Sequence, residues 1–441
     1  MALDKRDSDH LFQELRQGTV PQRGLDEIAV GIERQRSEID RLLGMAEDGE
    51  GVFKFLRGGY GCGKTFMARL ATLDAQRREP KPFATSFVVV SDNDLRFHHF
   101  NELYAKIVTE LATPTCPRGA LGDVLDRWIG GIEEQLIEMG VDEAAADFDD
   151  RVRNNLEQQL MALTKGKAPN DMVRVLRAIF DAKQEGDLET AGALQSWLSG
   201  SQNVAAGAKK TAGVKGDIAS ASAMKYLQGI LEIVKAAGYG GLLIVIDEAE
   251  TILRMRQDVR GKAMNAIRQI IDDAQNFPGL MWVFTGTPEF FDTKRGVMGL
   301  QPLHDRIKFK RHGDRASLRQ PQLELRPFDE DRLTNVAVRL RQTYRAEHPE
   351  RLAQRVTDEF VQQLVAKVTE GFAGDVGVVP RNFLRDFVEV MDLVDDDGGF
   401  HPMQAYEFKP KDLTEDEQRI VEGRPPFEPE PDDDKGYSLE F

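Results

Sequence analysis

The sequence predicts an α/β protein in which a five-stranded parallel sheet lies between layers of helices. Five apolar runs of strand length, separated by segments with helical periodicity, support this prediction: residues 52–56, 83–90, 242–246, 279–284 and 322–325. The run at 242–246 has no polar residue in alternation, which is typical of a strand buried on both faces of a parallel sheet. Open sheets of this kind bind ligands at the carboxyl ends of their strands. Polar residues that follow these runs are therefore the candidates for a functional site.

The composition indicates a globular protein of a reducing compartment. The 441 residues suffice for two or three domains, and the net charge of −16 argues against a protein that coats nucleic acid. Cys62 and Cys116 are too few for a disulfide framework. Residues 1–10 are polar and lack the apolar core of a signal peptide, and no later run has the length of a membrane span. We therefore expect a cytoplasmic protein without membrane contact.

A glycine-rich loop follows the first predicted strand. Residues 58–65 read Gly-Gly-Tyr-Gly-Cys-Gly-Lys-Thr, and a helical segment begins near Lys64. Glycines allow a tight turn whose N–H groups point at phosphate oxygens, and the helix N-terminus adds positive potential. Lys64 would reach the β- and γ-phosphates of ATP, and the hydroxyl of Thr65 would bind Mg²⁺. The residues predicted to surround the nucleotide are Gly58, Gly59, Tyr60, Gly61, Cys62, Gly63, Lys64, Thr65 and Phe66. The alternative is a glycine-rich turn that only happens to precede a lysine.

Two acidic residues end the buried run at 242–246. Asp247 would hold Mg²⁺ together with Thr65, and Glu248 would orient and deprotonate the water that attacks ATP. The alternative interpretation is an Asp-Glu pair that caps a helix. The phosphate loop favours the catalytic interpretation, because such a loop requires an acidic partner.

Two further positions are candidates for contact with the γ-phosphate. Thr285 ends the run at 279–284 and would sense the γ-phosphate, with Thr287 as the other candidate. Alternatively, both hydroxyls only satisfy backbone groups of a turn. Arg306 precedes the last strand and would act across a subunit boundary as an arginine finger. A surface ion pair is the alternative for this arginine.

The remaining segments divide the chain further. We expect residues 1–112 and 223–326 to form the core, with the N-terminal segment packed on the adenine, and residues 113–222 to form a helical insertion. The insertion would end in a flexible loop from residue 199, whose lysines are Lys209, Lys210 and Lys215.

Residues 327–400 read as a small helical lid, and residues 401–441 as an acidic, proline-rich tail. In the lid, Pro380 opens a helix that would direct Arg381 back at the γ-phosphate, so that the lid responds to the nucleotide. Arg385 lies one turn further and could instead pair with a carboxylate.

Taken in order, these residues resemble an AAA+ ATPase of the kind found in origin-recognition and Cdc6-like proteins. More narrowly, the sequence resembles the BREX-system ATP-binding protein family, of the BrxD type. The stretches that carry this resemblance are residues 57–66, 247–251, 284–291 and 379–385. The resemblance implies a role in bacterial anti-phage defence, alongside a partner DNA helicase.

The leading hypothesis is thus an oligomeric ATPase with Mg²⁺, Glu248 as the base, and Arg306 completing the site of a neighbouring subunit. Double-stranded DNA is a candidate ligand. The alternative is a nucleotide-gated recruitment module with little or no hydrolysis. A small-molecule kinase is a third interpretation, which Glu248 and the absence of an evident acceptor pocket argue against.

Overall fold

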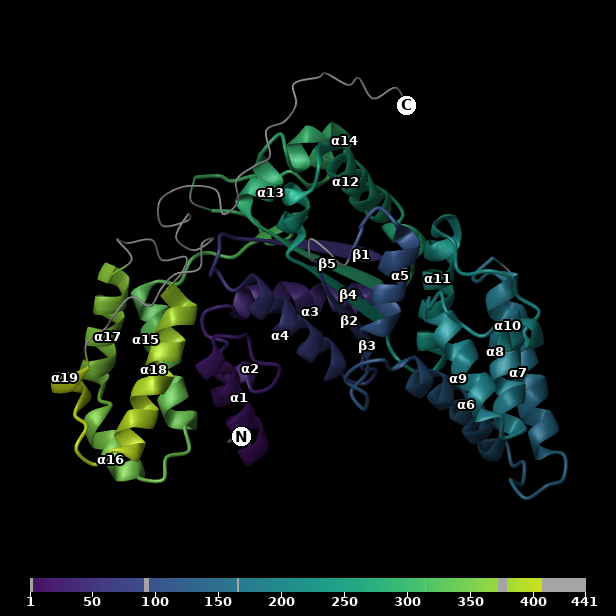
Figure 1. Ribbon diagram of the computed structural model, residues 1–441, viewed down its shortest axis with the longest axis horizontal. Helices are drawn as coiled ribbons and strands as arrows, with labels where there is room; N and C mark the ends of the chain where they lie inside the picture. The colour runs from purple at the N-terminus through teal and green to yellow at the C-terminus, as the bar shows by residue number, and fades with distance from the viewer. Residues whose placement is uncertain (1–2, 91–94, 165, 314, 372–378, 407–441) are drawn as a thin grey trace.

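A computed structural model describes residues 3–90, 95–164, 166–313, 315–371 and 379–406. A six-stranded sheet lies at the centre, in the order β3-β2-β4-β5-β1-β6, between a helical insertion on one side and a helical lid on the other (Figure 1). The strands are β1 (Val52–Arg57), β2 (Ala84–Val89), β3 (Leu111–Ala112), β4 (Leu242–Asp247), β5 (Leu280–Gly286) and β6 (Gln322–Glu324). The predicted α/β class is correct.

The sheet is mixed, and it has one strand more than predicted. The strands β2, β4, β5, β1 and β6 pair in parallel, whereas β3 pairs with β2 in the antiparallel sense. This pairing sets Thr85 opposite Ala112 and Ser86 opposite Leu111. A strand of two residues is too short to show any periodicity, so the sequence pattern gave no indication of it.

Helices cover both faces of the sheet, and successive residues of β4 face them alternately. Leu243 and Val245 pack in the cluster that contains α3 (Glu33–Glu47) and α4 (Lys64–Gln76). Leu242, Ile244 and Ile246 belong to the larger cluster on the opposite face. The helices of that cluster include α5 (Phe100–Thr109), α11 (Ser220–Ala236) and α12 (Gln257–Asp272). All six residues of β4 are buried, as the unbroken apolar run predicts.

An aromatic stack stabilises the centre of the sheet. The ring of Phe284 lies 4.9 Å from that of Phe55 and 5.9 Å from that of Trp282, and Phe284 is fully buried. We expect Phe284→Ala to lower the free energy of unfolding by about 3–5 kcal/mol, because it leaves a cavity in the apolar cluster on this face of the sheet. Urea denaturation would measure this loss, with Val89→Ala, at an exposed strand position, as the control. An equal loss in both variants would show that the stack does not stabilise the sheet.

The insertion is helical, as predicted, and shares one apolar cluster with the sheet. Its helices are α6 (Leu121–Glu138), α7 (Phe148–Thr164), α8 (Asn170–Gln184), α9 (Leu188–Leu198) and α10 (Ala206–Thr211). They extend away from the sheet on the right of Figure 1.

The predicted flexible loop at 199–222 is wrong, because this segment is folded. It contains α10, and Ala208, Val214 and Ile218 are buried. The indole N–H of Trp197 donates to the carbonyl of Gly216 at 2.9 Å, and Lys209 pairs with Asp217 at 2.7 Å. A few small apolar residues hold the segment, so its composition resembles that of a linker.

The lid consists of α15 (Glu330–Thr343), α16 (Pro349–Arg355), α17 (Asp358–Gly371), α18 (Val379–Asp396) and α19 (Pro402–Ala405). Two N-terminal helices, α1 (Lys5–Gln17) and α2 (Leu25–Ile28), share its apolar core, and the rings of Phe12 and Tyr344 meet edge to face at 5.0 Å. The N-terminal helices therefore pack with the lid, whereas the sequence analysis assigned this segment to the core that contains the sheet. Of the expected tail, residues 407–441 lie outside the described residues.

The short elements that complete the fold are η1 (Ala249–Arg254), η2 (Ala274–Asn276), α13 (Pro288–Asp292), η3 (Val297–Gly299) and α14 (Gln301–Ile307). Among the helices of the described ranges, none is both long and apolar enough to cross a membrane.

Candidate functional site

The glycine loop connects β1 to α4 at the carboxyl edge of the sheet. Gly61 and Gly63 have φ angles of 71° and 81°, which glycine adopts without strain. A Cβ on Gly58 would lie 2.9 Å from the carbonyl oxygen of Leu325, so a side chain there would displace the backbone beside β6. The glycines are therefore required for the path of this loop.

The side chain of Lys64 is buried and folded onto the loop. Its ammonium donates to the carbonyl oxygens of Gly58 and Gly59, each at 3.1 Å, and lies 5.1 Å from the centre of the Tyr60 ring. It also lies 3.5 Å from Oε1 of Glu250. The positive charge of Lys64 thus lies where the loop would bind phosphate groups.

Neighbouring strands bring Asp247 and Thr285 together. β4 and β5 run in parallel with Ile246 opposite Phe284, so the next residue of each strand meets its counterpart. The hydroxyl of Thr285 donates to Oδ1 of Asp247 at 2.5 Å and accepts the backbone N–H of Glu248 at 2.9 Å. Thr287 is also buried, at the start of α13. Thr285 is therefore the threonine that contacts both acidic positions.

Glu248 has an unusual backbone conformation. Its φ of 59° is the left-handed conformation, which no other residue apart from glycines adopts in the described ranges. Side chains pay roughly 1–2 kcal/mol for this conformation, and the hydrogen bond from Glu248 N–H to Thr285 helps to hold it. Such strain is typical of residues that must present a side chain in a fixed direction.

The carboxyl of Glu248 lies in a negative environment. Partial removal from water raises its pKa, and the charges of Asp247 and Glu250 raise it further, while Lys64 and Arg254 act in the opposite direction. A raised pKa brings a carboxylate closer to the basicity that suits proton transfer near neutral pH.

This environment predicts the pH dependence of any hydrolysis that uses Glu248 as the base. The base must be ionised, so the rate should rise as pH increases through the raised pKa and then reach a plateau. Glu250→Gln removes one charge that raises this pKa, so it should move the midpoint of the rise to lower pH. Initial rates between pH 4.5 and 8 at saturating ATP would measure the shift, and a midpoint unmoved or moved upward would contradict it.

The oxygen groups at this edge fit a Mg²⁺ ion. Asp247 is buried with a carboxylate oxygen held by Thr285, and Thr65 lies in the first turn of α4. Mg²⁺ prefers oxygen ligands and commonly combines one carboxylate with phosphate oxygens and water. In the described part of the chain, no group of three or more His, Cys, Asp and Glu could hold a metal by itself.

Two more residues contact this site, and the sequence motifs do not predict a separate role for either of them. Glu250 stands within the acidic motif, two residues after Glu248, and only the structure shows its contact with Lys64. Phe328 follows β6, and a Cβ on Gly63 would lie 3.6 Å from its ring. Phe66 and Phe328 both pack against the apolar core of the lid, so α4 and the segment between β6 and α15 join the phosphate loop to the lid.

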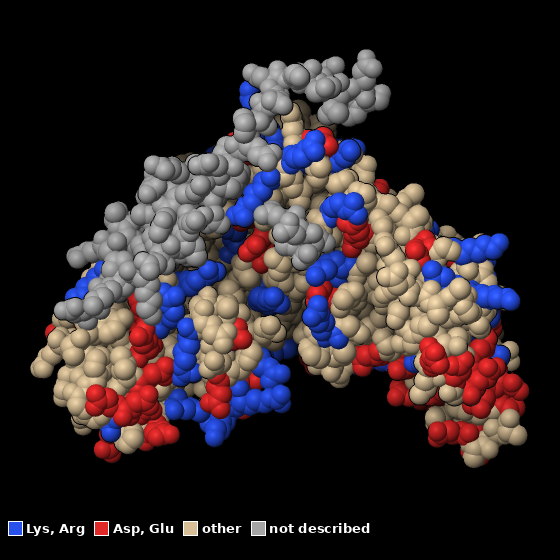
Figure 2. All heavy atoms as spheres, in the orientation of Figure 1, with Lys and Arg blue, Asp and Glu red and all other residues tan. Residues whose placement is uncertain are grey.

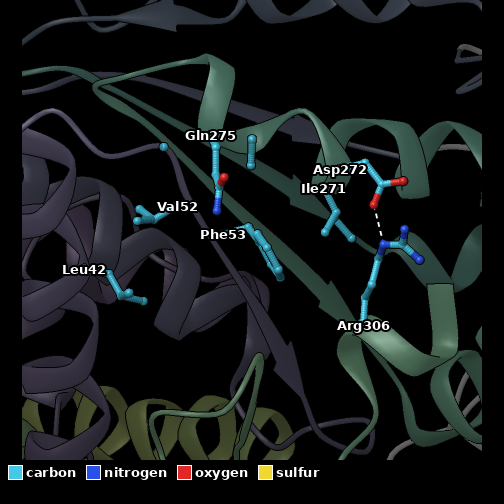
Figure 3. A pocket seen from close by; sticks show the side chains of 9 residues that line it. Leu42, Val52, Phe53, Ile271, Asp272, Gln275 and Arg306 are labelled. Carbon is cyan, nitrogen blue, oxygen red and sulfur yellow. Dashed lines mark ion pairs between the residues drawn. The ribbon is translucent and has the colours of Figure 1, made fainter. Parts of the chain in front are cut away.

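Arg306 lies away from the loop of its own chain. Its guanidinium pairs with Asp272 and donates to the carbonyl of Pro302 at 2.6 Å, beside a cavity of about 460 Å³ (Figure 3). The residues lining this cavity are Leu42, Gly51, Val52, Phe53, Ile271, Asp272, Ala274, Gln275 and Arg306. Val52 and Phe53 begin β1, whereas the phosphate loop follows its end, roughly 17–20 Å away along the strand. The pairing of Arg306 with Asp272 is the surface ion pair that the alternative interpretation of this arginine predicts.

Arg381 and Arg385 lie near the start of α18. A Cβ on Gly18, at the end of α1, would lie 3.5 Å from Cγ of Arg381, and Arg381 is exposed. The structure thus places Arg381 between the lid and α1. Arg385 donates to Asn382 at 3.0 Å and lies 3.9 Å from a carboxylate oxygen of Asp386, which fits the ion-pair interpretation.

The parallel strands, the glycine loop with its buried lysine and the acidic pair define a P-loop protein of the α/β class. The chain belongs to the family described as BREX system ATP-binding protein BrxC/D, whose model matches residues 3–410. This match confirms the family expected from the sequence motifs.

One solved structure that this chain is similar to is described as the structure of Drosophila ORC bound to DNA. It has 13% sequence identity and a TM-score of 0.36, and the match covers 89% of this chain and 63% of that chain. The chain therefore spans less than two thirds of that relative's length. No curated protein matches the sequence significantly.

Proposed function

We propose that the protein binds and hydrolyses ATP with Mg²⁺, as an AAA+ ATPase in BREX-type defence of bacteria against phage. The observation that carries this proposal is the arrangement of polar groups at the carboxyl ends of β1, β4 and β5. Lys64 lies on the loop that follows β1, and Thr285 is hydrogen-bonded both to Asp247 and to the backbone of Glu248. Family membership supports the nucleotide and the defence system.

The chemistry assigns a different task to each side chain. Lys64 would turn from the loop carbonyls to the β- and γ-phosphates, while Asp247 and Thr65 hold Mg²⁺, which neutralises phosphate charge. Glu248 would accept a proton from water as the water oxygen forms its bond to the γ-phosphorus. The bond from that phosphorus to the bridging oxygen breaks, which yields ADP and inorganic phosphate. Thr285 would sense the γ-phosphate while it keeps Asp247 and the backbone of Glu248 in place.

We propose further that the site is shared between subunits of an oligomer. Arg306 is remote from the loop of its own chain, yet its side chain is 41% exposed and available to a neighbour. Phe66 and Phe328 would transmit the nucleotide state to the lid, and Arg381 would turn from Gly18 toward the γ-phosphate when the lid closes.

The partner proposed is a DNA helicase of the same defence system, in the cytoplasm, and double-stranded DNA would bind to this chain or to that partner. Acidic side chains gather at the outer end of the insertion, at the lower right of Figure 2. Within the insertion, burial raises the pKa of Glu133, and the charges of Glu143 and Asp149 raise it further. Such a surface repels DNA and fits a basic protein surface, so the insertion supports a protein partner rather than direct DNA contact.

Steady-state phosphate release, measured with and without duplex DNA, tests the proposed activity. An ATPase that acts on DNA should release phosphate in both conditions and accelerate when DNA and partner are present. A rate near zero in every condition, with ATP still bound, would instead support a nucleotide-gated recruitment module.

Lys64→Ala should raise the dissociation constant for ATP by about two orders of magnitude. The change removes charge-assisted hydrogen bonds to phosphate, each worth roughly 1.5–3 kcal/mol. Isothermal titration calorimetry would measure it, with Lys210→Ala in α10 as a control that also removes one positive charge. Unchanged affinity in Lys64→Ala would exclude the loop as the ATP site.

A further inference from the structure

Glu250 is a buried carboxylate whose surroundings leave one oxygen without a partner. It lies in η1, which begins two residues after the end of β4, and is 7% exposed. Its Oε1 atom is 3.5 Å from Nζ of Lys64, whereas its Oε2 atom is buried without a hydrogen-bond partner. A buried carboxylate oxygen without a donor is costly, so this position calls for an explanation.

The contact explains the resting position of Lys64. The ammonium is surrounded by two loop carbonyls and the carboxylate of Glu250, all within 3.5 Å. The carbonyls satisfy hydrogen bonds, and the carboxylate supplies the negative charge that a buried cation requires. A bound polyphosphate would supply the same charge to the same cation.

We propose that Glu250 stands in for phosphate: it holds Lys64 while the site is empty and competes with the nucleotide for that lysine. This proposal rests on the proposed function only in that the nucleotide is taken to be ATP. When Lys64 turns to the phosphates, Glu250 loses its cation and remains buried near a polyanion. Glu250 therefore weakens nucleotide binding, and the effect grows with the number of phosphate charges.

Glu250→Gln should tighten ATP binding by about tenfold, since it removes a negative charge a few ångströms from the phosphates. The gain for ADP should be smaller, because ADP carries less charge. Calorimetric titration of the full chain with ATP and ADP would measure both. Glu185→Gln, at an exposed position between α8 and α9, removes the same net charge and should leave both affinities unchanged. Unchanged or weaker ATP binding in Glu250→Gln would overturn the proposal.

A second measurement needs no nucleotide. In the ligand-free protein, Lys64→Met and Glu250→Gln should each lower the melting temperature, because each leaves the other charge buried without its partner. In the double variant, the decrease in melting temperature should be smaller than the sum of the decreases in the two single variants. Strict additivity would overturn the proposed pairing. If the unmodified protein binds no ATP, the proposed function fails, and this cycle still decides whether Glu250 holds Lys64.

Discussion

Glu248→Gln is expected to lower the steady-state rate of ATP hydrolysis by about a thousandfold while ATP binding changes by less than a few fold. General-base catalysis contributes roughly 10²–10⁴ in rate, and glutamine cannot accept the proton. Glutamine has nearly the same shape, so the left-handed backbone at this position and its hydrogen bond to Thr285 should persist. Phosphate release and calorimetric titration would measure the two quantities on the same preparation.

The control for this prediction is Glu185→Gln, which changes the same residue type far along the chain in the insertion. Its rate should equal that of the unmodified protein. Full ATPase activity in Glu248→Gln would mean that another group deprotonates the water. Loss of binding together with loss of rate would mean that Glu248 supports the structure of the site rather than the chemical step.

The sequence predicted the parts of the site that strand order alone brings together. An apolar run followed by a polar residue predicts a strand end, and parallel strands present all such ends at one edge of the sheet. Residues 58–65, Asp247 and Thr285 follow this rule, and the structure places them at that edge. No knowledge of side-chain direction was needed for this step.

The parts that depend on packing between distant segments could not be predicted in this way. The contact of Glu250 with Lys64 joins residues 186 positions apart, and nothing in the acidic motif indicates which carboxylate turns toward the loop. Likewise, α1 has the periodicity of any amphipathic helix, which does not reveal that its apolar face packs on the lid.

Composition misled the prediction at residues 199–222. Glycine, alanine and lysine are typical of linkers, but four buried apolar side chains and the hydrogen bond from Trp197 suffice to fold this segment on the insertion. The position of Arg381 could not be predicted for a different reason. Helical periodicity predicts on which face of a helix an arginine lies, but it does not predict how the lid is placed relative to the sheet.

Arg306→Ala is expected to lower ATP hydrolysis in the assembled protein by about a thousandfold, since arginine fingers contribute roughly 10³–10⁵ in rate. The start of β1, where Arg306 lies, is remote from the loop that ends the strand, so the effect should require a neighbouring subunit. Dilution to single subunits should therefore abolish the difference between the variant and the unmodified protein. Mass photometry with an ATP analogue would establish the assembly state in each sample, and Lys308→Ala, also at the end of α14, serves as the control.

Mixing two inactive variants separates action within a subunit from action between subunits. Lys64→Ala subunits retain Arg306, and Arg306→Ala subunits retain the phosphate loop, so a mixed assembly contains some complete sites at subunit boundaries. Hydrolysis should thus recover to a fraction of the unmodified rate when the two variants are mixed, although neither is active alone. If mixing restores nothing while mixed assemblies form, Arg306 does not complete a neighbour's site, and its pairing with Asp272 is then only a structural contact of α12 with α14.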